Sequence, residues 1–227
     1  MQYDIVMEGG GAKGIVFVGA LQEFEKRGHT FDRMLGTSAG AISATLLAAG
    51  YSSSEMVEAL KEEVDGQPVF RTFMGTPGDF SDEEKEESAA ADYLRQVDIP
   101  FMREEWENRF DSWLVDKMLN LESFRHIFSF VERGGWYSAD RYLSWMRDKL
   151  NSGTTKGQQR NFGDMTFSQF YVATGTELTL VAADTTGQRM LVLNHLTAPD
   201  CPVLWGTRMS MSIPLLWEEV TWQEEWG

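Results

Sequence analysis

The sequence predicts an α/β fold of three layers, α/β/α, in which helices cover both faces of a mostly parallel central sheet. Two strand-like apolar segments in the first 50 residues are each followed by a helix-like segment, and a glycine-containing turn joins each pair. Strands that alternate with helices in this way are typical of parallel sheets. The chain of 227 residues is long enough for one sizeable core, so we expect a single domain over residues 1–227.

The first two strand-to-helix units are predicted from apolar periodicity. Residues 3–7 and 31–35 are the expected strands, and residues 15–27 and 39–49 are the expected helices. The first helix ends in basic residues and is followed by Gly28. This order is typical of a helix C-terminus, because cations favour the negative end of the helix dipole and glycine readily adopts a left-handed conformation there.

Residues 69–135 differ in composition and are predicted to form a helical acidic insertion within the domain. Dense acid alternates there with aromatic residues, namely Phe73, Phe80, Phe101, Trp106, Phe110, Trp113, Phe124 and Phe128. The acidic run over residues 82–87 is typical of a solvated face. A second interpretation is that the insertion forms a lid or an interfacial surface, which Phe and Trp at an amphipathic boundary favour. The sequence leaves both interpretations open.

The C-terminal part returns to regular patterning. A helix is predicted from an N-cap at Ser138, with apolar residues at helical spacing, namely Leu143, Met146 and Leu150. Residues 178–183 and 190–193 are predicted strands. The polar segment 184–187 between them ends in glycine and predicts a turn.

Composition and charge argue against several classes of function. The net charge is −15, from 20 Lys and Arg against 35 Asp and Glu, which repels nucleic-acid phosphates and leaves no polybasic patch for anionic lipid. The histidines are scattered at positions 29, 126 and 195, and the single cysteine is Cys201. We therefore predict no metal cluster, no cofactor and no disulfide framework.

The cellular location is predicted from what the sequence lacks. No apolar run approaches the roughly 18 to 20 residues of a membrane span, and the first residues lack the features of a signal peptide. We expect a cytoplasmic protein. Four tryptophans near the end of the chain favour either transient contact with a membrane surface or ordinary core packing, namely Trp205, Trp217, Trp222 and Trp226.

The motif Gly36-Thr37-Ser38-Ala39-Gly40 matches G-x-S-x-G and stands where the second predicted strand stops and a helix starts. This is the context of a nucleophile elbow, a sharp turn that exposes the serine hydroxyl above a sheet. The small flanking residues remove side chains that would collide where strand and helix cross. Ser38 is therefore the candidate nucleophile.

A second motif, Gly9-Gly10-Gly11-Ala12-Lys13-Gly14, leaves the first strand and enters the first helix. Consecutive glycines let backbone N–H groups converge on an anion without interference from Cβ atoms. Neighbouring strand ends of a parallel sheet meet at one edge, where ligands bind. We therefore expect this loop to lie beside Ser38 and to form an oxyanion hole through Gly9, Gly10 and Gly11.

The same loop also satisfies G-x-G-x-x-G, the pattern of a dinucleotide-binding loop. The acid that binds ribose should end the second strand, yet Asp32 lies at its beginning and the strand ends in the Ser38 motif. A Walker loop does not match either, because Lys13 is followed by glycine. The sequence therefore favours acyl transfer over nucleotide binding.

The two motifs together, G-G-G-x-[KR]-G and then G-T-S-A-G about 25 residues later, resemble those of the patatin-like phospholipases. The resemblance continues in Met165-Thr166-Phe167, in the segment 180–187, and in Ser210-Met211-Ser212-Ile213-Pro214, which is similar to the family's Ser-x-Ser-x-Pro. It touches both ends of the chain and is weak over residues 69–135.

This resemblance implies a lipid acyl hydrolase of phospholipase A or esterase type with a Ser-Asp dyad and no histidine. Ser38 would attack an ester carbonyl, the loop amides would hold the oxyanion, and an aspartate would act as base. In the family that aspartate opens an Asp-Gly-Gly or Asp-Gly-Ala motif after Ser-x-Ser-x-Pro, and no aspartate follows Asp200 here. We expect the chain to be truncated at its C-terminus, with the base beyond Gly227 and the 227 residues themselves inactive.

Two rival interpretations stay open. Ser38, Asp184 and His195 follow the chain order of an α/β-hydrolase triad. Asp184, however, lies in a predicted turn, for which a structural role is more typical. The second rival is a non-catalytic module that binds lipid or a partner and lacks the base.

Overall fold

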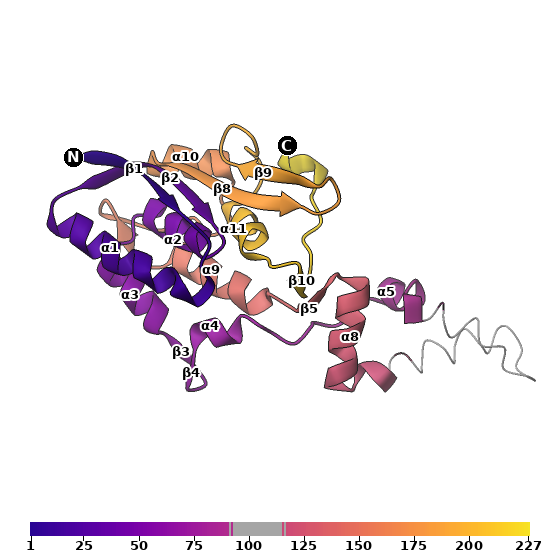
Figure 1. Ribbon diagram of the computed structural model, residues 1–227. Helices are drawn as coiled ribbons and strands as arrows, with labels where there is room; N and C mark the ends of the chain where they lie inside the picture. The colour runs from indigo at the N-terminus through magenta and orange to yellow at the C-terminus, as the bar shows by residue number, and fades with distance from the viewer. Residues whose placement is uncertain (91, 93–114, 116) are drawn as a thin grey trace, which may run out of the picture. The chain divides into compact units, whose positions relative to one another are not determined.

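The computed structural model describes residues 1–90, 92, 115 and 117–227 (Figure 1). Contacts divide them into two compact units. The sheet unit comprises Met1–Phe73, Asp140–Ser212 and Val220–Gly227, and the helical unit comprises Met74–Ala139 and Ile213–Glu219. In the described part of the chain, no helix combines the length and the apolar composition that crossing a membrane requires.

The sheet unit is built on four strands in the order β1-β2-β8-β9. Their bounds are Gln2–Met7, Thr30–Thr37, Glu177–Asp184 and Arg189–Leu193. The first three strands run parallel and β9 pairs antiparallel to β8. This mostly parallel central sheet with helices confirms the predicted α/β fold class. The strand β2 runs two residues further than expected and reaches the Ser38 turn directly.

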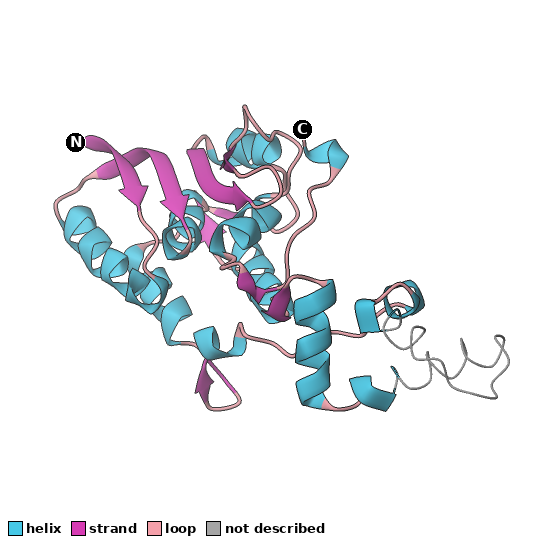
Figure 2. Cartoon of the chain, turned by 45° about the vertical axis from the view of Figure 1, so that its right-hand side comes forward, coloured by secondary structure: helices cyan, strands magenta, loops and turns pink. Residues whose placement is uncertain are grey.

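Most helices of the described chain belong to the sheet unit. Helices are cyan and strands magenta in Figure 2. The helices of the sheet unit are α1 (Ile15–Lys26), α2 (Ala39–Ala48), α3 (Ser53–Lys61), α4 (Val69–Thr72), α9 (Asp140–Asn151), α10 (Phe167–Thr174) and α11 (Val203–Met211). The unit also has two 3₁₀ turns, η1 (Gly11–Gly14) and η2 (Glu224–Trp226). Two short hairpins complete it, β3–β4 (Glu63–Val64, Gln67–Pro68) and β6–β7 (Thr154–Thr155, Gln158–Gln159). Gly28 follows α1 with φ 68°, as predicted. The helix predicted from Ser138 begins at Asp140.

One face of the sheet forms the core of this unit. Met7, Gly36, Leu180 and Leu193 pair across the four strands and are all buried. The helices α2 and α11 both pack against the sheet. Because successive strand residues point to opposite faces, Val6 belongs to the other face, where its side chain is 72% exposed.

The tryptophans at the end of the sheet unit pack on one another. Trp226 is buried, and its ring centroid lies 6.2 Å from that of Trp205 and 5.4 Å from that of Trp222. Trp205 and Trp222 are half-buried. These contacts favour ordinary packing over a membrane-facing role for the three side chains.

The helical unit contains α5 (Asp82–Glu86), α8 (Glu122–Glu132) and the parallel pair β5 (Gly135–Tyr137) and β10 (Leu215–Trp217). Its small core comprises Phe80, Val115, Leu119 and Phe128. Arg133 lies 4.2 Å from the centre of the Phe80 ring and pairs with Glu84 at 2.7 Å. The hydrogen bonds from Arg133 lower the pKa of Glu84 to about 2.

Within α5 the other acids are exposed, as expected of a solvated face. Phe101, Trp106, Phe110 and Trp113 lie outside the described residues, and the lid hypothesis stays a prediction.

Candidate active site

Ser38 lies between the last residue of β2 and the first residue of α2. Its backbone has φ 54° and ψ −122°, a region that L-residues other than glycine seldom adopt. Such a conformation costs about 1 to 3 kcal/mol and persists only where the surrounding structure fixes it. The residue is half-buried, and within the described part of the chain its hydroxyl makes no hydrogen bond. This is the geometry that a nucleophile elbow requires.

Glycines at two positions let the elbow pack tightly. A Cβ atom at Gly40 would lie 2.1 Å from the carbonyl oxygen of Met7, at the end of β1. A Cβ atom at Gly36 would lie 2.6 Å from the carbonyl oxygen of Gly40. The first turn of α2 therefore lies directly against the backbone of β1 and β2, and only glycine fits at either position.

We expect Gly40→Ala to lower the free energy of unfolding by about 2 to 3 kcal/mol, because the new methyl group must displace the end of β1. Gly19→Ala is the matched control, since Gly19 is exposed within α1 and an added Cβ meets nothing within 4 Å. That variant is expected to gain about 0.5 to 1 kcal/mol from helix propensity. Urea unfolding of both variants measures the difference, and equal effects would contradict the close packing of the elbow.

The glycine loop lies beside the elbow. A Cβ atom at Gly9 would lie 3.2 Å from the Cβ of Ser38 and 3.8 Å from its Oγ, and one at Gly14 would lie 3.0 Å from the Cβ of Ala39. Gly11 has φ 53° and begins the 3₁₀ turn η1. The side chains of Ala12 and Lys13 are outside what the structure describes.

The start of α2 adds a second source of positive potential near Ser38. Ala39 is its first residue, the first turn holds no acidic residue, and helix N-termini favour negative charge. The loop and this helix terminus therefore meet around one hydroxyl, which is an arrangement suited to stabilising an oxyanion.

Ser210, in α11, contacts the backbone of Ser38. The N–H of Ser38 donates to the Oγ of Ser210 at 3.0 Å, and the hydroxyl of Ser210 donates to the carbonyl oxygen of Val181 at 2.6 Å. From the sequence, Ser210 was only part of a segment similar to Ser-x-Ser-x-Pro. Nothing in the local pattern indicates its contact with Ser38, which is 172 residues away.

The structure does not bring Asp184 and His195 together. The carboxylate of Asp184 accepts from the N–H of Gly187 at 2.8 Å and from the Nε of Arg189 at 2.9 Å. These bonds lower the pKa of Asp184 and make its carboxylate a weaker base. The ring of His195 stacks on Tyr171 at 4.0 Å, and its Nδ1 is buried with no hydrogen-bond partner in the described chain. The turn role predicted for Asp184 is thus the role that its contacts support.

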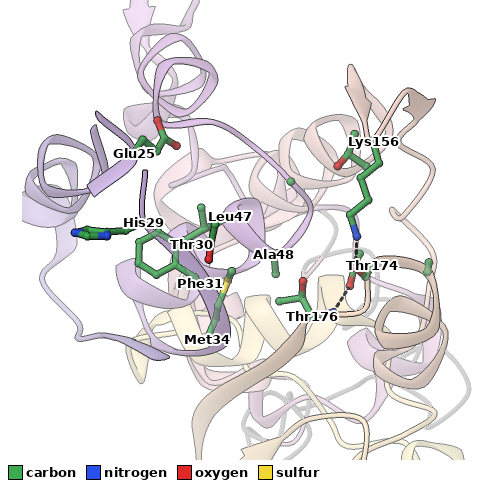
Figure 3. A pocket seen from close by; sticks show the side chains of 13 residues that line it. Glu25, His29, Thr30, Phe31, Met34, Leu47, Ala48, Lys156, Thr174 and Thr176 are labelled. Carbon is green, nitrogen blue, oxygen red and sulfur yellow. Dashed lines mark hydrogen bonds between the residues drawn. The ribbon is translucent and has the colours of Figure 1, made fainter. Parts of the chain in front are cut away.

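A cavity of about 260 Å³ opens elsewhere in the sheet unit (Figure 3). Thr30 at the start of β2, Leu47 near the end of α2 and Thr176 just before β8 contribute to its wall. Figure 3 shows Lys156 donating to the carbonyl oxygen of Thr174 at this cavity, a bond of 2.9 Å. Ser38 follows the opposite end of β2, so this cavity is separate from the candidate nucleophile.

Comparison with known sequences gives a family match and two kinds of relative. The patatin-like phospholipase family model matches residues 5–226. The uncharacterized protein YqhO of Bacillus subtilis is 33% identical over 233 residues, which cover 100% of this chain and 61% of that protein. The uncharacterized NTE family protein Rv2565 of Mycobacterium tuberculosis is 39% identical over 62 residues, which cover 27% of this chain and 11% of that protein.

Two solved structures are similar to this chain at low identity. VipD of Legionella pneumophila matches with a TM-score of 0.44 and 19% identity, over 95% of this chain and 43% of that one. ExoU of Pseudomonas aeruginosa, in complex with SpcU, matches with a TM-score of 0.44 and 20% identity, over 94% of this chain and 38% of that one. The chain thus spans less than two thirds of the length of the proteins it matches.

Proposed function

Since this chain belongs to the patatin-like phospholipase family, we propose that it carries the nucleophile and the oxyanion hole of a lipid acyl hydrolase. The single observation on which the proposal depends is the strained backbone of Ser38, with its hydroxyl beside Gly9. A residue is held in such a conformation at functional sites more often than elsewhere. The proposed substrates are acyl esters of a lipid or phospholipid.

The proposed reaction has two steps. The Oγ of Ser38 attacks the ester carbonyl carbon while a carboxylate base takes its proton, and the amides of Gly9, Gly10 and Gly11 donate to the negative oxygen that forms. The intermediate collapses, the alcohol leaves with the proton, and the acyl group stays on Ser38. Water then attacks the acyl-enzyme with the same base, which releases the fatty acid and restores the serine.

The base in this proposal is an aspartate outside the described residues. In the described chain, the carboxylate of Asp184 is held by Gly187 and Arg189. The family pattern places the dyad aspartate after Ser-x-Ser-x-Pro, and we therefore propose a position beyond Gly227. The peripheral membrane contact expected from the sequence also stays a proposal.

Labelling with a fluorophosphonate tests the nucleophile directly, because the probe reacts with an activated serine hydroxyl. We expect the full-length protein to acquire one adduct, which fragmentation mass spectrometry places on Ser38. Ser43 is the matched control, since it lies in the same region and its hydroxyl donates to the carbonyl of Ala39 at 3.2 Å.

Ser43→Ala should label like the unmodified protein, and Ser38→Ala should not label. Equal labelling of both variants would refute the assignment of Ser38. A folded full-length protein that does not label at all would favour the non-catalytic binding module.

A further inference from the structure

Ser210 connects three elements of the sheet unit through one hydroxyl. It lies near the end of α11, is 8% exposed, and contacts the backbone of Ser38 and of Val181 in β8. A hydroxyl has one proton, and the carbonyl of Val181 can only accept. Ser210 therefore donates to Val181 and accepts from Ser38, so both bonds have a fixed direction.

This contact involves the backbone N–H of Ser38, whereas α2 contacts its carbonyl oxygen. The carbonyl oxygen of Ser38 accepts from the N–H of Ala41 at 2.9 Å and of Ile42 at 3.3 Å, so α2 fixes that peptide plane. The N–H of Ser38 belongs to the preceding peptide plane, and its partner is Ser210. The two planes together determine φ and ψ of Ser38, and thereby the direction of the Cα–Cβ bond that carries its hydroxyl.

The same bond also affects which donors remain for an oxyanion. The N–H of Ser38 is already paired with a buried hydroxyl, so it is not free to donate to an oxyanion. The amides of the glycine loop and of the first turn of α2 are then the candidate donors near Ser38, since Gly9 lies beside its side chain. The hydroxyl of Ser210 has one proton, which it donates to Val181, so it has none to donate to an oxyanion.

We propose that Ser210 is a positioning residue that, through this single hydrogen bond, helps set the backbone conformation of Ser38 and hence the direction in which its Cα–Cβ bond presents the hydroxyl. The inference rests on the proposed function, because it assumes that Ser38 is the nucleophile. A positioning role differs from a merely structural one in what loss of the bond does. Loss of the bond should slow the reaction of Ser38 at a temperature where the protein is still folded.

The test compares Ser210→Ala, Ser210→Thr and Ser43→Ala in the full-length protein. Ser43 is an internal control because it is also 8% exposed and its hydroxyl also donates to a carbonyl, that of Ala39. The readouts are the rate of fluorophosphonate labelling, kcat and KM for a short acyl ester, the thermal midpoint, and hydrogen exchange of the Ser38 amide by NMR.

We expect Ser210→Ala to lower kcat and the labelling rate about 10- to 100-fold with KM unchanged, the loss that a misplacement of about an ångström causes. The thermal midpoints of Ser210→Ala and Ser43→Ala should both stay above the assay temperature, so that the measured rates compare folded proteins. Ser210→Thr keeps the hydroxyl and should recover most of the rate. The Ser38 amide should exchange at least about tenfold faster in Ser210→Ala than in Ser43→Ala, since it loses its partner.

Several results would overturn the inference. A labelling rate of Ser210→Ala within threefold of that of Ser43→Ala would do so. A loss of rate in Ser210→Thr as large as that in Ser210→Ala, with the two variants equally stable, would also do so. Failure of the proposed function gives a different pattern, in which the unmodified protein does not label at Ser38. The amide exchange still decides the hydrogen bond in that case, because it requires no catalysis, and unchanged exchange would refute the contact.

Discussion

Ser38→Ala is expected to lower acyl-ester hydrolysis by the full-length protein about 10⁴-fold or more, which is typical when a serine nucleophile is removed. The alanine side chain has no oxygen that could form the acyl-enzyme. The loop at Gly9, Gly10 and Gly11 keeps its backbone amides, so a small residual rate from binding and oxyanion stabilisation is expected. Steady-state hydrolysis of a short-chain ester measures the loss, and an unchanged thermal midpoint shows that the variant is folded.

His195→Ala is the control for this prediction. Its ring stacks on Tyr171, and Asp184 is bonded to Gly187 and Arg189, so no hydrogen bond connects the two proposed triad partners. We expect hydrolysis within about threefold of the unmodified protein, which is a change of less than about 1 kcal/mol in the activation barrier. A loss in His195→Ala as large as that in Ser38→Ala would support the triad and contradict the dyad.

Arg160→Ala is expected to lower the free energy of unfolding by about 2 to 4 kcal/mol, because two backbone carbonyls lose a buried donor, at about 1 to 3 kcal/mol each. The Arg160 side chain is 1% exposed. Its guanidinium donates to the carbonyls of Ala49 and Gly50 at 3.1 and 2.8 Å, at the end of α2. It also pairs with Glu55 at 2.9 Å. Alanine would leave these carbonyls without a donor, and urea unfolding measures the loss.

Arg33→Ala is the matched control for Arg160. Arg33 also pairs with a carboxylate, that of Asp4, but the two side chains are 61% and 47% exposed. Water replaces such a partner at little cost, so we expect a change below about 1 kcal/mol. If both variants lost the same stability, the buried network around Arg160 would not have the role described here.

The candidate site was predictable from the sequence to the extent that it depends on local backbone geometry. Gly36, Ser38 and Gly40 form a motif whose strand-turn-helix setting is visible in the pattern of apolar residues, and the structure has a turn there, in which Ser38 has a positive φ. The glycine loop was predicted to lie beside Ser38, because neighbouring parallel strands end at one edge.

The sequence by itself therefore determined the fold class, the two glycine motifs and the family. Each of these is indicated by short stretches of consecutive residues. Only the tertiary structure decided that Ser210 reaches the Ser38 amide, that Arg160 caps α2, and that Asp184 and His195 lie apart. These contacts join residues far apart in sequence, and a serine or an arginine in a helix or loop carries no local signal of its partner. Their geometry arises from how strands and helices pack against one another. This packing fixes the directions of side chains, which apolar periodicity and secondary-structure propensity do not determine.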